Sequence, residues 1–420
     1  MQLPFPVEAS ILAILPLSTA RKFVQRHTTV APPISNRKNQ RIFVDVSVFA
    51  KHDAGTGIQR VVREVLNHLT KNLEKNSILI PIAASKRGSY CRINLSQIDA
   101  SGIEKQGPNP VSLTKGDIFL GLDLAAHILP RHHNQLLKWK RAGASIQVVV
   151  YDLLPALHPQ WFNPQSARNH KKWLKTLAIF SDRFHCISFT VKSDLLLWFK
   201  TKYNISLPKN AAHVFPLGSN LESKNTINKK ILQADISAHE AIDFVRKAPT
   251  FLIVGTIEPR KGHAEVLQAF EDAWKKGFNY QLLVVGAPGW KTDMVQKKLL
   301  SASKENTKLL WLRDAQDSLL TQIYKSVAGV IVASEGEGYG LPLIEAAFFG
   351  RPVLARDIPV FREISQGSVT FFPKDPSQGL TAESLILWMI SCETQKETTL
   401  NFNPPSWEAS AKVLLSNMTQ

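Results

Sequence analysis

Residues 330–359 read VIVASEGEGYGLPLIEAAFFGRPVLARDIP, and this stretch decides the predicted fold. Its first four residues, 330–333, are a short apolar run rich in β-branched residues, which is typical of a strand buried on both faces of a parallel sheet. SEGEGYG then interrupts regular structure, and Pro342 suits the first turn of a helix. Gly350 and Pro352 end that helix before a second apolar run. The stretch therefore predicts a strand, turn, helix and strand of an α/β protein.

The glycine-rich turn brings a helix N-terminus close to two glutamates. Unpaired N–H groups and a partial positive charge at such a terminus suit a phosphate-bearing ligand. Glu337 lies in the turn, and Glu345 follows after seven intervening residues, in the first turns of the helix. Glu345 could accept two ribose hydroxyls, and Glu337 could reach a hexose beyond the phosphates. Alternatively, Glu345 only complements the helix dipole and Glu337 is a solvated loop charge.

EGYGLPLIEA, followed by GRPVLARDIPVFREI, resembles the paired-glutamate signature of the retaining glycosyltransferase family 4. In that family, two Rossmann-like α/β domains of the GT-B fold face each other across a cleft and close over a sugar nucleotide. The resemblance implies that Glu345 holds the nucleotide ribose, and that Glu337 lies beside the donor sugar as a catalytic residue. It also assigns the intervening turn to the donor site, with Gly338, Tyr339, Gly340 and Leu341.

A second phrase of the same family, GTIEPRKG, follows the apolar run 251–254. Arg260 and Lys261 would then project from the C-terminal end of a strand. Two cations match the charge of a diphosphate, with the arginine binding in a bidentate manner and the lysine as a compact charge. Taken alone, the pair is more simply a solvated basic turn. The resemblance implies that both residues hold the donor phosphates and that Lys261 takes part in catalysis.

The first domain is expected to open with a strand at 42–46 and the loop KHDAGTGIQR, which leads into a helix. This loop lacks the third glycine of a dinucleotide fingerprint, because Arg60 occupies that place, and it has no P-loop lysine. It resembles a GTGxxR loop of the glycosyltransferase family that faces the cleft. By that resemblance, Gly55 and Gly57 would bind the donor and Arg60 the acceptor.

The phrase YDLLPALHP, residues 151–159, follows another expected strand. Ligands of open α/β sheets lie at the C-terminal ends of strands, so Asp152 is a candidate catalytic residue. Many family members carry a histidine where this sequence has Tyr151. A phenol with a pKa of about 10 can bind a sugar hydroxyl but is a poor base at neutral pH, so we expect the departing phosphate to take the acceptor proton. Tyr151 and His158 are candidate acceptor-binding residues, although His158 is more simply structural.

The length of 420 residues suits two domains of about 200 residues each. A polar stretch at 219–247 has the composition of a linker. By resemblance, the last helix packs back on the first domain. The expected organisation is an N-terminal extension at 1–40, an acceptor domain at 41–218, a linker at 219–248, a donor domain at 249–395 and a C-terminal helix at 396–420.

Composition narrows the partners and the compartment. The chain has 51 Lys+Arg against 34 Asp+Glu, a formal charge of +17 that favours an anionic partner such as a nucleotide or a phospholipid headgroup. It lacks the interleaved aromatic and basic motifs of RNA-binding proteins, so we expect no nucleic acid. Three separated cysteines favour a reducing cytoplasm. The apolar run 11–15 is too short to span a bilayer, and it is either a surface extension or a peripheral contact with the inner face of the cell membrane.

No Asp-x-Asp pair follows an expected strand, and the histidines at 127, 132 and 133 form no helical ligand pair. We therefore expect neither a metal nor a cofactor beyond the nucleotide-sugar substrate. Arg260, Lys261 and the helix N-terminus would stabilise the leaving diphosphate in place of a cation.

The resemblance as a whole implies a retaining, metal-independent glycosyltransferase. GTGIQR and YDLLPALHP look most similar to mannosyl- and rhamnosyltransferases of bacterial surface polysaccharide synthesis, which favours GDP-mannose as donor. The acceptor would be a glycan or lipid-linked glycan of an O-antigen, capsule or exopolysaccharide. Two alternatives remain open: a catalytically inactive nucleotide-sugar or glycan-binding protein, which Tyr151 allows, and a sugar-nucleotide epimerase of the same fold.

Overall fold

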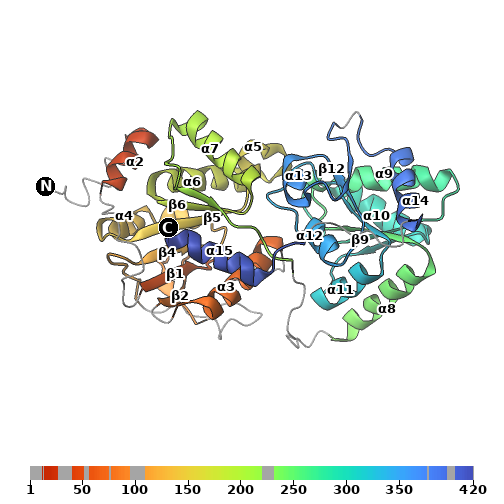
Figure 1. Ribbon diagram of the computed structural model, residues 1–420, viewed down its shortest axis with the longest axis horizontal. Helices are drawn as coiled ribbons and strands as arrows, with labels where there is room; N and C mark the ends of the chain where they lie inside the picture. The colour runs from red at the N-terminus through yellow and green to blue at the C-terminus, as the bar shows by residue number, and fades with distance from the viewer. Residues whose placement is uncertain are drawn as a thin grey trace. The chain divides into compact units, whose positions relative to one another are not determined.

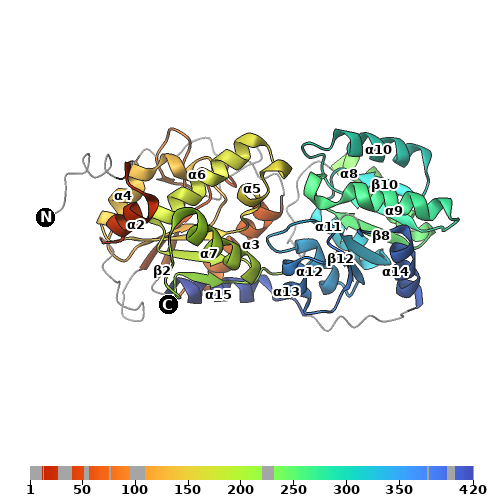
Figure 2. The same ribbon diagram turned by 90° about the horizontal axis from the view of Figure 1, so that it is seen from above.

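The computed structural model describes residues 12, 14–26, 40–51, 56–74, 77–94, 109–219, 231–375, 378–394 and 403–419 (Figures 1 and 2). The chain divides into two compact units. Unit 1 comprises Met1–Leu217 together with Trp407–Gln420, and unit 2 comprises Gly218–Ser406.

Unit 1 is built on a seven-stranded sheet with the order β3-β2-β1-β4-β5-β6-β7. All neighbouring strands are parallel except β2 and β3. The strands are β1 (Gln40–Asp45), β2 (Ser77–Ala83), β3 (Cys91–Arg92), β4 (Ile118–Gly121), β5 (Ser145–Val150), β6 (Arg183–Cys186) and β7 (Ala212–Val214). The α-helices are α2 (Leu17–Gln25), α3 (Gly57–Asn72), α4 (His133–Arg141), α5 (Leu154–Leu157), α6 (Pro164–Phe180), α7 (Phe189–Tyr203) and α15 (Trp407–Thr419).

Helix α3 shows how local sequence sets these elements. Thr56 caps the helix through a reciprocal pair of bonds: its hydroxyl accepts from the Gln59 N–H, and the Gln59 side chain accepts from the Thr56 N–H. Val61, Val65 and Leu69 follow at a spacing of four residues and are buried. This spacing places them on one helix face, which packs into the unit.

The last helix of the chain belongs to unit 1. Figure 1 shows α15 lying along α3, in agreement with their contacts. The Asn417 amide donates to the Val214 carbonyl (3.1 Å), and the Met418 carbonyl accepts from the Gln147 side chain (3.2 Å). Trp407 and Leu414 are buried along the helix. Residues about 200 positions or more apart in sequence are therefore joined in one folded unit.

Helix α2 lies on α6, with Ala20 and Val24 fully buried. It falls in the range 1–40 that was predicted to be an extension, and residues 11 and 13 of the apolar run 11–15 lie outside the described residues. None of the helices in the described part of the chain combines the length and the hydropathy that a transmembrane span requires.

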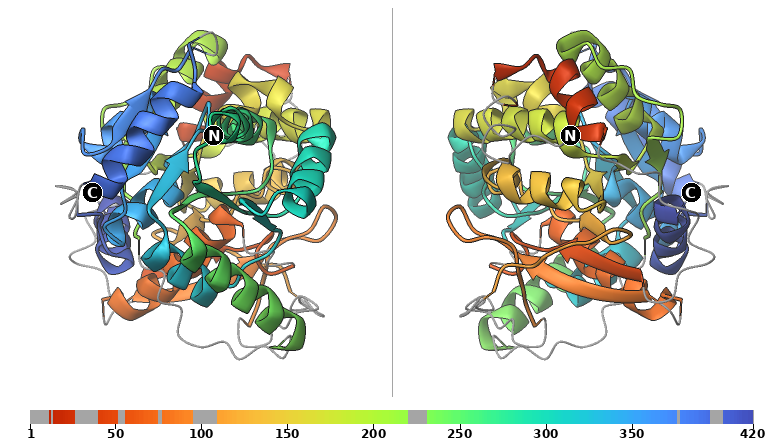
Figure 3. Two further views of the ribbon diagram at one scale, coloured as in Figure 1. Left: turned by 90° about the vertical axis from the view of Figure 1, so that its right-hand side faces the viewer. Right: turned by 90° about the vertical axis from the view of Figure 1, so that its left-hand side faces the viewer.

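Unit 2 contains a six-stranded parallel sheet with the order β10-β9-β8-β11-β12-β13 (Figure 3). The strands are β8 (Thr250–Val254), β9 (Gln281–Val285), β10 (Leu309–Leu312), β11 (Gly329–Val332), β12 (Val353–Arg356) and β13 (Thr370–Phe372). The α-helices are α8 (Ile231–Lys247), α9 (His263–Lys275), α10 (Asp293–Glu305), α11 (Asp317–Ser326), α12 (Leu341–Phe348), α13 (Pro359–Ser365) and α14 (Ala382–Thr394).

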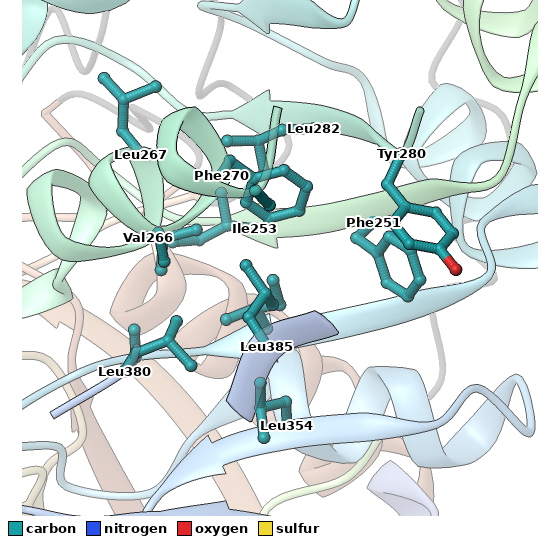
Figure 4. Close-up of a cluster of buried hydrophobic side chains, with 14 of the residues drawn as sticks. Phe251, Ile253, Val266, Leu267, Phe270, Tyr280, Leu282, Leu354, Leu380 and Leu385 are labelled. Carbon is teal, nitrogen blue, oxygen red and sulfur yellow. The ribbon is translucent and has the colours of Figure 1, made fainter. Parts of the chain in front are cut away.

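One buried cluster joins the sheet of unit 2 to helices α9 and α14 (Figure 4). Phe251 on β8 lies beside Phe270 of α9 and Trp388 of α14, with ring centroids 6.5 and 5.2 Å away. Gly329 on β11 leaves room for the same indole, because a Cβ there would lie 2.7 Å from Trp388 Cη2. Apolar strands and helix faces thus close this side of the sheet without voids at the glycine.

Helix α8 occupies much of the range 219–248, which was predicted to be a linker. Ala241, Phe244 and Val245 in its second half are buried, and α8 contacts α11. The stretch is polar overall, but these three apolar residues fall on one helix face. A helix of unit 2 therefore replaces an unstructured linker over Ile231–Lys247.

Two carboxyl groups are buried at the C-terminal ends of β1 and β4. Asp45 Oδ2 accepts from the Tyr90 hydroxyl (2.7 Å), and Asp45 Oδ1 accepts from the Ser47 N–H (2.9 Å). Asp123 accepts from two backbone N–H groups of the loop that follows β1. Burial raises the pKa of Asp45 to about 7, and the nearby charge of Asp123 contributes to the rise. Ser47 and Tyr90 oppose the rise by hydrogen bonding.

This raised pKa predicts that unit 1 loses stability as the pH rises. The folded-state pKa of Asp45, about 7, lies above the usual aspartate pKa of 3.8, so its contribution to stability is fully present below pH 4 and is lost as the pH rises through 7. Urea unfolding should give a lower free energy of unfolding at pH 8 than at pH 5, by up to about 2.5 kcal/mol. Asp45→Asn should flatten this dependence, whereas Asp314→Asn, at an exposed position of unit 2, should leave it unchanged. An unaltered pH dependence in Asp45→Asn would contradict the prediction.

Candidate active site

The glycine-rich turn and helix α12 in unit 2 form the frame of the candidate site. Helix α12 begins immediately after Gly340, whose φ is +119°. A Cβ at this glycine would lie 2.7 Å from Phe361 Cε1, so both the backbone conformation and the space favour glycine. Pro342 lies in the first turn of the helix, as predicted. Gly338 and Tyr339 are buried, and Leu341 is half-buried where the helix starts.

Glu337 in this turn is held by two cations from the loop after β8. Arg260 Nη1 lies 2.9 Å from Glu337 Oε2, and Lys261 Nζ lies 2.6 Å from Glu337 Oε1. Burial alone would raise the pKa of Glu337, but the charges of Arg260 and Lys261 outweigh this effect and hold the pKa at about 2. Hydrogen bonds from Lys261 and Ser334 act in the same direction. Glu337 is therefore ionised throughout the physiological pH range.

Backbone contacts join the same two loops. Arg260 Nη1 donates to the Gly336 carbonyl (2.9 Å), and the Arg260 carbonyl accepts from the Glu335 N–H (2.7 Å). Gly262 has a φ of +73°, and a Cβ there would lie only 2.4 Å from the Ala333 carbonyl oxygen. The close approach of the loops thus depends on a glycine at this position.

Glu258 is a further charged member of the site that the sequence analysis missed. Its Oε2 lies 3.0 Å from Arg260 Nε. Burial raises the pKa of Glu258, although Arg260 and Lys261 lower it. Two cations and two carboxylates therefore meet in one place, so any anion that binds these cations has to compete with the carboxylates. Its position inside the phrase GTIEPRKG could have marked Glu258 as a site residue. That position alone does not predict that the Glu258 side chain contacts Arg260.

Glu345 lies in the second turn of α12 and is buried, 3% exposed. The hydroxyl of Tyr324, on α11, donates to Glu345 Oε2 (2.7 Å). The Tyr324 ring stacks on Phe349 with centroids 5.5 Å apart. The carboxylate of Glu345 is therefore held in place by a neighbouring helix. Sequence reasoning missed Tyr324, because no motif links α11 to the turn.

Arg356 is a buried residue that binds the backbone at the start of the glycine-rich turn. Its side chain is 1% exposed, and Nε donates to the Ala333 carbonyl (3.0 Å). The guanidinium also pairs with Glu265 of α9, whose other oxygen accepts from the Leu380 N–H (2.6 Å). Because the turn begins at the carbonyl that Arg356 binds, Arg356 positions the loop that carries Glu337. In the sequence, Arg356 stands out only as part of the family phrase GRPVLARDIPVFREI.

The candidate residues of unit 1 follow β1 and β5, so they share one edge of a parallel sheet. Gly57 is the first residue of α3 and Arg60 lies in its first turn, while Gly55 falls outside the described residues. Asp152 accepts from the Leu154 N–H (2.9 Å) and is partly buried. The His158 ring stacks on Trp161 with centroids 4.2 Å apart.

Tyr151 does not present its phenol to a ligand, contrary to the prediction. It is 3% exposed, and its hydroxyl donates to the Leu122 carbonyl (2.7 Å). Burial raises the pKa of Tyr151 well above its usual value, and the charge of Asp123 adds to the rise. A buried phenol that donates a hydrogen bond to a backbone carbonyl stabilises the fold. Sequence alone does not show that a residue at a strand end has this role.

The structure thus brings together Arg260, Lys261, Glu337, the turn 338–341 and Glu345 within unit 2, and groups the remaining candidates at one sheet edge of unit 1. Among the described residues, no group of three or more His, Cys, Asp or Glu side chains is arranged to hold a metal ion.

Sequence comparison places this site among known proteins. Residues 236–401 match the family described as "Glycosyl transferases group 1". Over 409 residues, 96% of the chain, the sequence is 36% identical to the serotype-specific mannosyltransferase WbdA of Escherichia coli, of which it covers 46%. The chain belongs to the group 1 glycosyltransferases. It spans about half the length of the WbdA relatives that it matches.

Solved structures agree with the GT-B fold expected of a group 1 glycosyltransferase. The catalytic domain of starch synthase IV from Arabidopsis thaliana, bound to ADP and acarbose, superposes with a TM-score of 0.59 at 13% identity, covering 91% of this chain and 99% of that one. Anabaena Alr3699/HepE in complex with UDP gives 0.55 at 14% identity, covering 91% and 96%. The predicted family and the predicted fold of two Rossmann-like α/β units are therefore confirmed.

The buried contacts of Arg356 at the start of the glycine-rich turn predict that its substitution lowers the free energy of unfolding strongly. Arg356→Met should lower the free energy of unfolding by about 3 kcal/mol, because Glu265 then loses its charged partner and the Ala333 carbonyl its donor. Arg362→Gln, which breaks an exposed ion pair with Asp357, should cost less than about 1 kcal/mol. Urea unfolding measures both. Equal losses in the two variants would contradict the prediction, because the buried pair of Arg356 would then contribute no more than an exposed pair.

Proposed function

We propose that this glycosyltransferase moves mannose from GDP-mannose to a glycan, with retention of configuration and without a metal ion, in the synthesis of a bacterial surface polysaccharide. The observation that carries the proposal is the cluster of Arg260, Lys261 and Glu337 beside the start of α12. Mannose is the sugar named for WbdA, which is 36% identical over most of this chain. The sugar rests on that relative, whereas the GDP donor, the acceptor and the polysaccharide class rest on the resemblance of GTGIQR and YDLLPALHP described above.

In this proposal, Arg260 and Lys261 bind the diphosphate of the donor. Both side chains are 14% exposed, so their charges act in a partly desolvated site where a diphosphate is held strongly. The first turn of α12 adds N–H groups and the positive end of the helix dipole. As the bond to the sugar breaks, negative charge grows on the diphosphate, and the two cations stabilise it.

Glu337 exchanges partners when the donor binds. Glu337 pairs with both cations, 2.9 Å from Arg260 and 2.6 Å from Lys261. A diphosphate takes over these cations and leaves the carboxylate to a hydroxyl of the sugar. While Glu337 is paired with Arg260 and Lys261, its pKa is about 2, so it enters this exchange as a carboxylate. Its contribution is a fixed negative charge that stabilises positive charge developing on the sugar ring.

Glu345 binds the ribose of the nucleotide. The bond from Tyr324 fixes one carboxylate oxygen and so orients the side chain. A carboxylate offers about four acceptor positions, so hydroxyls of a ribose can be accepted beside that bond. Tyr324 is thus a positioning residue for the nucleotide.

The acceptor is assigned to the edge of unit 1 that carries Asp152, Arg60 and His158. The Tyr151 phenol already donates to a backbone carbonyl, so the departing phosphate, rather than a side chain at position 151, takes the acceptor proton. We place this reaction in the cytoplasm, at the inner face of the membrane, with a glycan or lipid-linked glycan as acceptor. The three cysteines, none in a disulfide, agree with a reducing compartment.

The charge balance of the site predicts the effects of two substitutions on turnover and on GDP binding. Lys261→Ala should lower kcat about a hundredfold or more, because a stabiliser of the leaving diphosphate is lost. Glu337→Gln should also lower kcat but should bind GDP as tightly as the native protein or more tightly, because a competitor for the cations is removed. GDP-mannose turnover and GDP calorimetry measure these effects, with Lys275→Ala, at an exposed site, as control.

Retained activity in excess chelator is expected in the same assay. Strict dependence on added magnesium or manganese would contradict the metal-independent reaction. Binding of GDP-mannose without transfer to any glycan would favour the inactive binding protein, and conversion of the donor to another nucleotide sugar would favour the epimerase.

The role of Glu345 predicts a loss in nucleotide affinity. Glu345→Ala should weaken GDP binding by about 1.5–3 kcal/mol, the range typical of a hydrogen bond to a charged group. Tyr324→Phe removes only the hydroxyl that orients Glu345 and should give a smaller loss. Titration calorimetry with GDP and with pyrophosphate separates the ribose contact from the diphosphate contact. Pyrophosphate has no ribose, so its binding should not change in either variant. Unchanged GDP affinity in Glu345→Ala would refute the assignment.

A further inference from the structure

A hollow of about 390 Å³ lies in unit 1, away from the residues assigned to the reaction. It is lined by α2, by the first residue of β6 and by the segment 204–211 that leads into β7. Helix α2 contacts α6 on this side of the unit (Figures 1 and 2). Strands β5, β6 and β7 are parallel, so the hollow lies at the sheet edge opposite to Asp152.

Two arginines in the lining are fixed in place by backbone carbonyls. Arg21 Nη1 donates to the carbonyls of Ala178 and Ser181, both at 2.9 Å. Arg183 Nη1 donates to the Asn417 carbonyl at 2.8 Å. A guanidinium has five N–H donors, and within the described part of the chain the remaining nitrogens of these arginines have no hydrogen-bond acceptor. Both side chains are therefore held in position with donors to spare.

Positive charge in this hollow exceeds negative charge. Asp182 is the carboxylate of the lining, and it is already engaged, since Oδ1 lies 2.5 Å from Lys140 Nζ and Oδ2 accepts from the Ile146 N–H. Burial lowers the pKa of Arg21 and of Arg183, although Asp182 partly offsets this in both. Lys22 adds a third cation to the lining. The single charge of Asp182 is shared among Lys140, Arg21 and Arg183, so the lining keeps a net positive charge that favours the binding of an anion.

The remaining lining residues are mostly small polar groups that can donate hydrogen bonds. The group comprises Ser18, Gln25, Asn204, Ser206 and Asn210. Such residues contact phosphate oxygens in proteins, and arginine forks match two of those oxygens at once. Apolar ligands would find little to contact there, because Ile205, Pro208 and Ala211 are the hydrophobic members.

We propose that this hollow binds a phosphoryl group, separately from the sugar-nucleotide site in unit 2. The preoriented guanidinium groups of Arg21 and Arg183, together with Lys22, would hold its oxygens. The same chemistry is presented by inorganic phosphate and by the headgroup of an anionic phospholipid. This proposal is independent of the proposed function, because none of its residues takes part in the reaction.

The test uses the full-length chain and two substitutions at exposed lining positions. Lys22→Gln removes a cation, and Asn210→Asp introduces a carboxylate without touching the backbone carbonyl that accepts from His213. The double variant should bind phosphate at least about tenfold more weakly. Lys200→Gln is the matched control, since it removes one exposed cation of α7 outside the hollow. Arg183→Gln provides a second test, because its amide can still donate to the Asn417 carbonyl.

Two probes identify the source of the phosphoryl group. Inorganic phosphate is titrated by thermal shift against chloride of equal ionic strength, and flotation compares phosphatidylglycerol vesicles with phosphatidylcholine vesicles. The Lys261→Ala variant serves as a parallel background, so that phosphate bound in unit 2 is not counted. Saturable binding of phosphate alone identifies free phosphate, and flotation with phosphatidylglycerol that phosphate competes away identifies the headgroup.

Either result supports the proposal if the double variant loses binding, Lys200→Gln keeps it and turnover of GDP-mannose is unchanged. The proposal is overturned if wild type binds neither probe, or if the double variant binds both as wild type does. It is also overturned if Lys200→Gln loses as much as the double variant, because binding would then follow only the net charge of +17.

Discussion

The ion pairs of Glu337 with Arg260 and Lys261 fix the positions of the two loops that form the candidate site of unit 2. Together with Glu258, these residues make two positive and two negative charges, which are tolerable in a partly buried place because they balance one another. The same pairing draws the loop after β8 and the loop after β11 together, and the glycine at 262 makes room for that approach. A ligand that competes for the cations would therefore act on both loops at once, so binding and loop geometry are coupled in this unit.

Much of this arrangement was predictable because it is local or carries a family phrase. The apolar runs that became β8, β9, β10 and β11 are short, continuous and bounded by glycine or charge, so their type and order could be read directly. The turn before α12 was equally clear, since glycine at 340 and proline at 342 each have a backbone reason. Spacing alone placed Glu337 and Glu345 around one helix start.

The features that sequence reasoning missed are contacts between distant segments. Arg356 reaches Glu265 and the Ala333 carbonyl, and Tyr324 reaches Glu345, but in each case the partner belongs to another element. The phenol of Tyr151 was predicted to face a ligand because strand ends usually do, yet a backbone carbonyl claims it. The polar composition of 219–247 predicted a linker, but part of this stretch forms α8, which has an apolar face. Local patterns determine the elements, whereas pairing across the fold determines which side chains remain for a ligand.

The membership of α15 in unit 1 has a consequence for biosynthesis. Residues of unit 2 all precede α15 in the chain, whereas unit 1 needs both the first 217 residues and the segment from Trp407. During synthesis, unit 2 can therefore fold before α15 has left the ribosome. Until α15 emerges, the face of unit 1 that Leu414 and Met418 cover in the folded protein remains exposed to water. During that interval the growing chain exposes an apolar surface along α3. A chaperone that shields this surface until synthesis reaches the last helix would raise the yield of the folded protein.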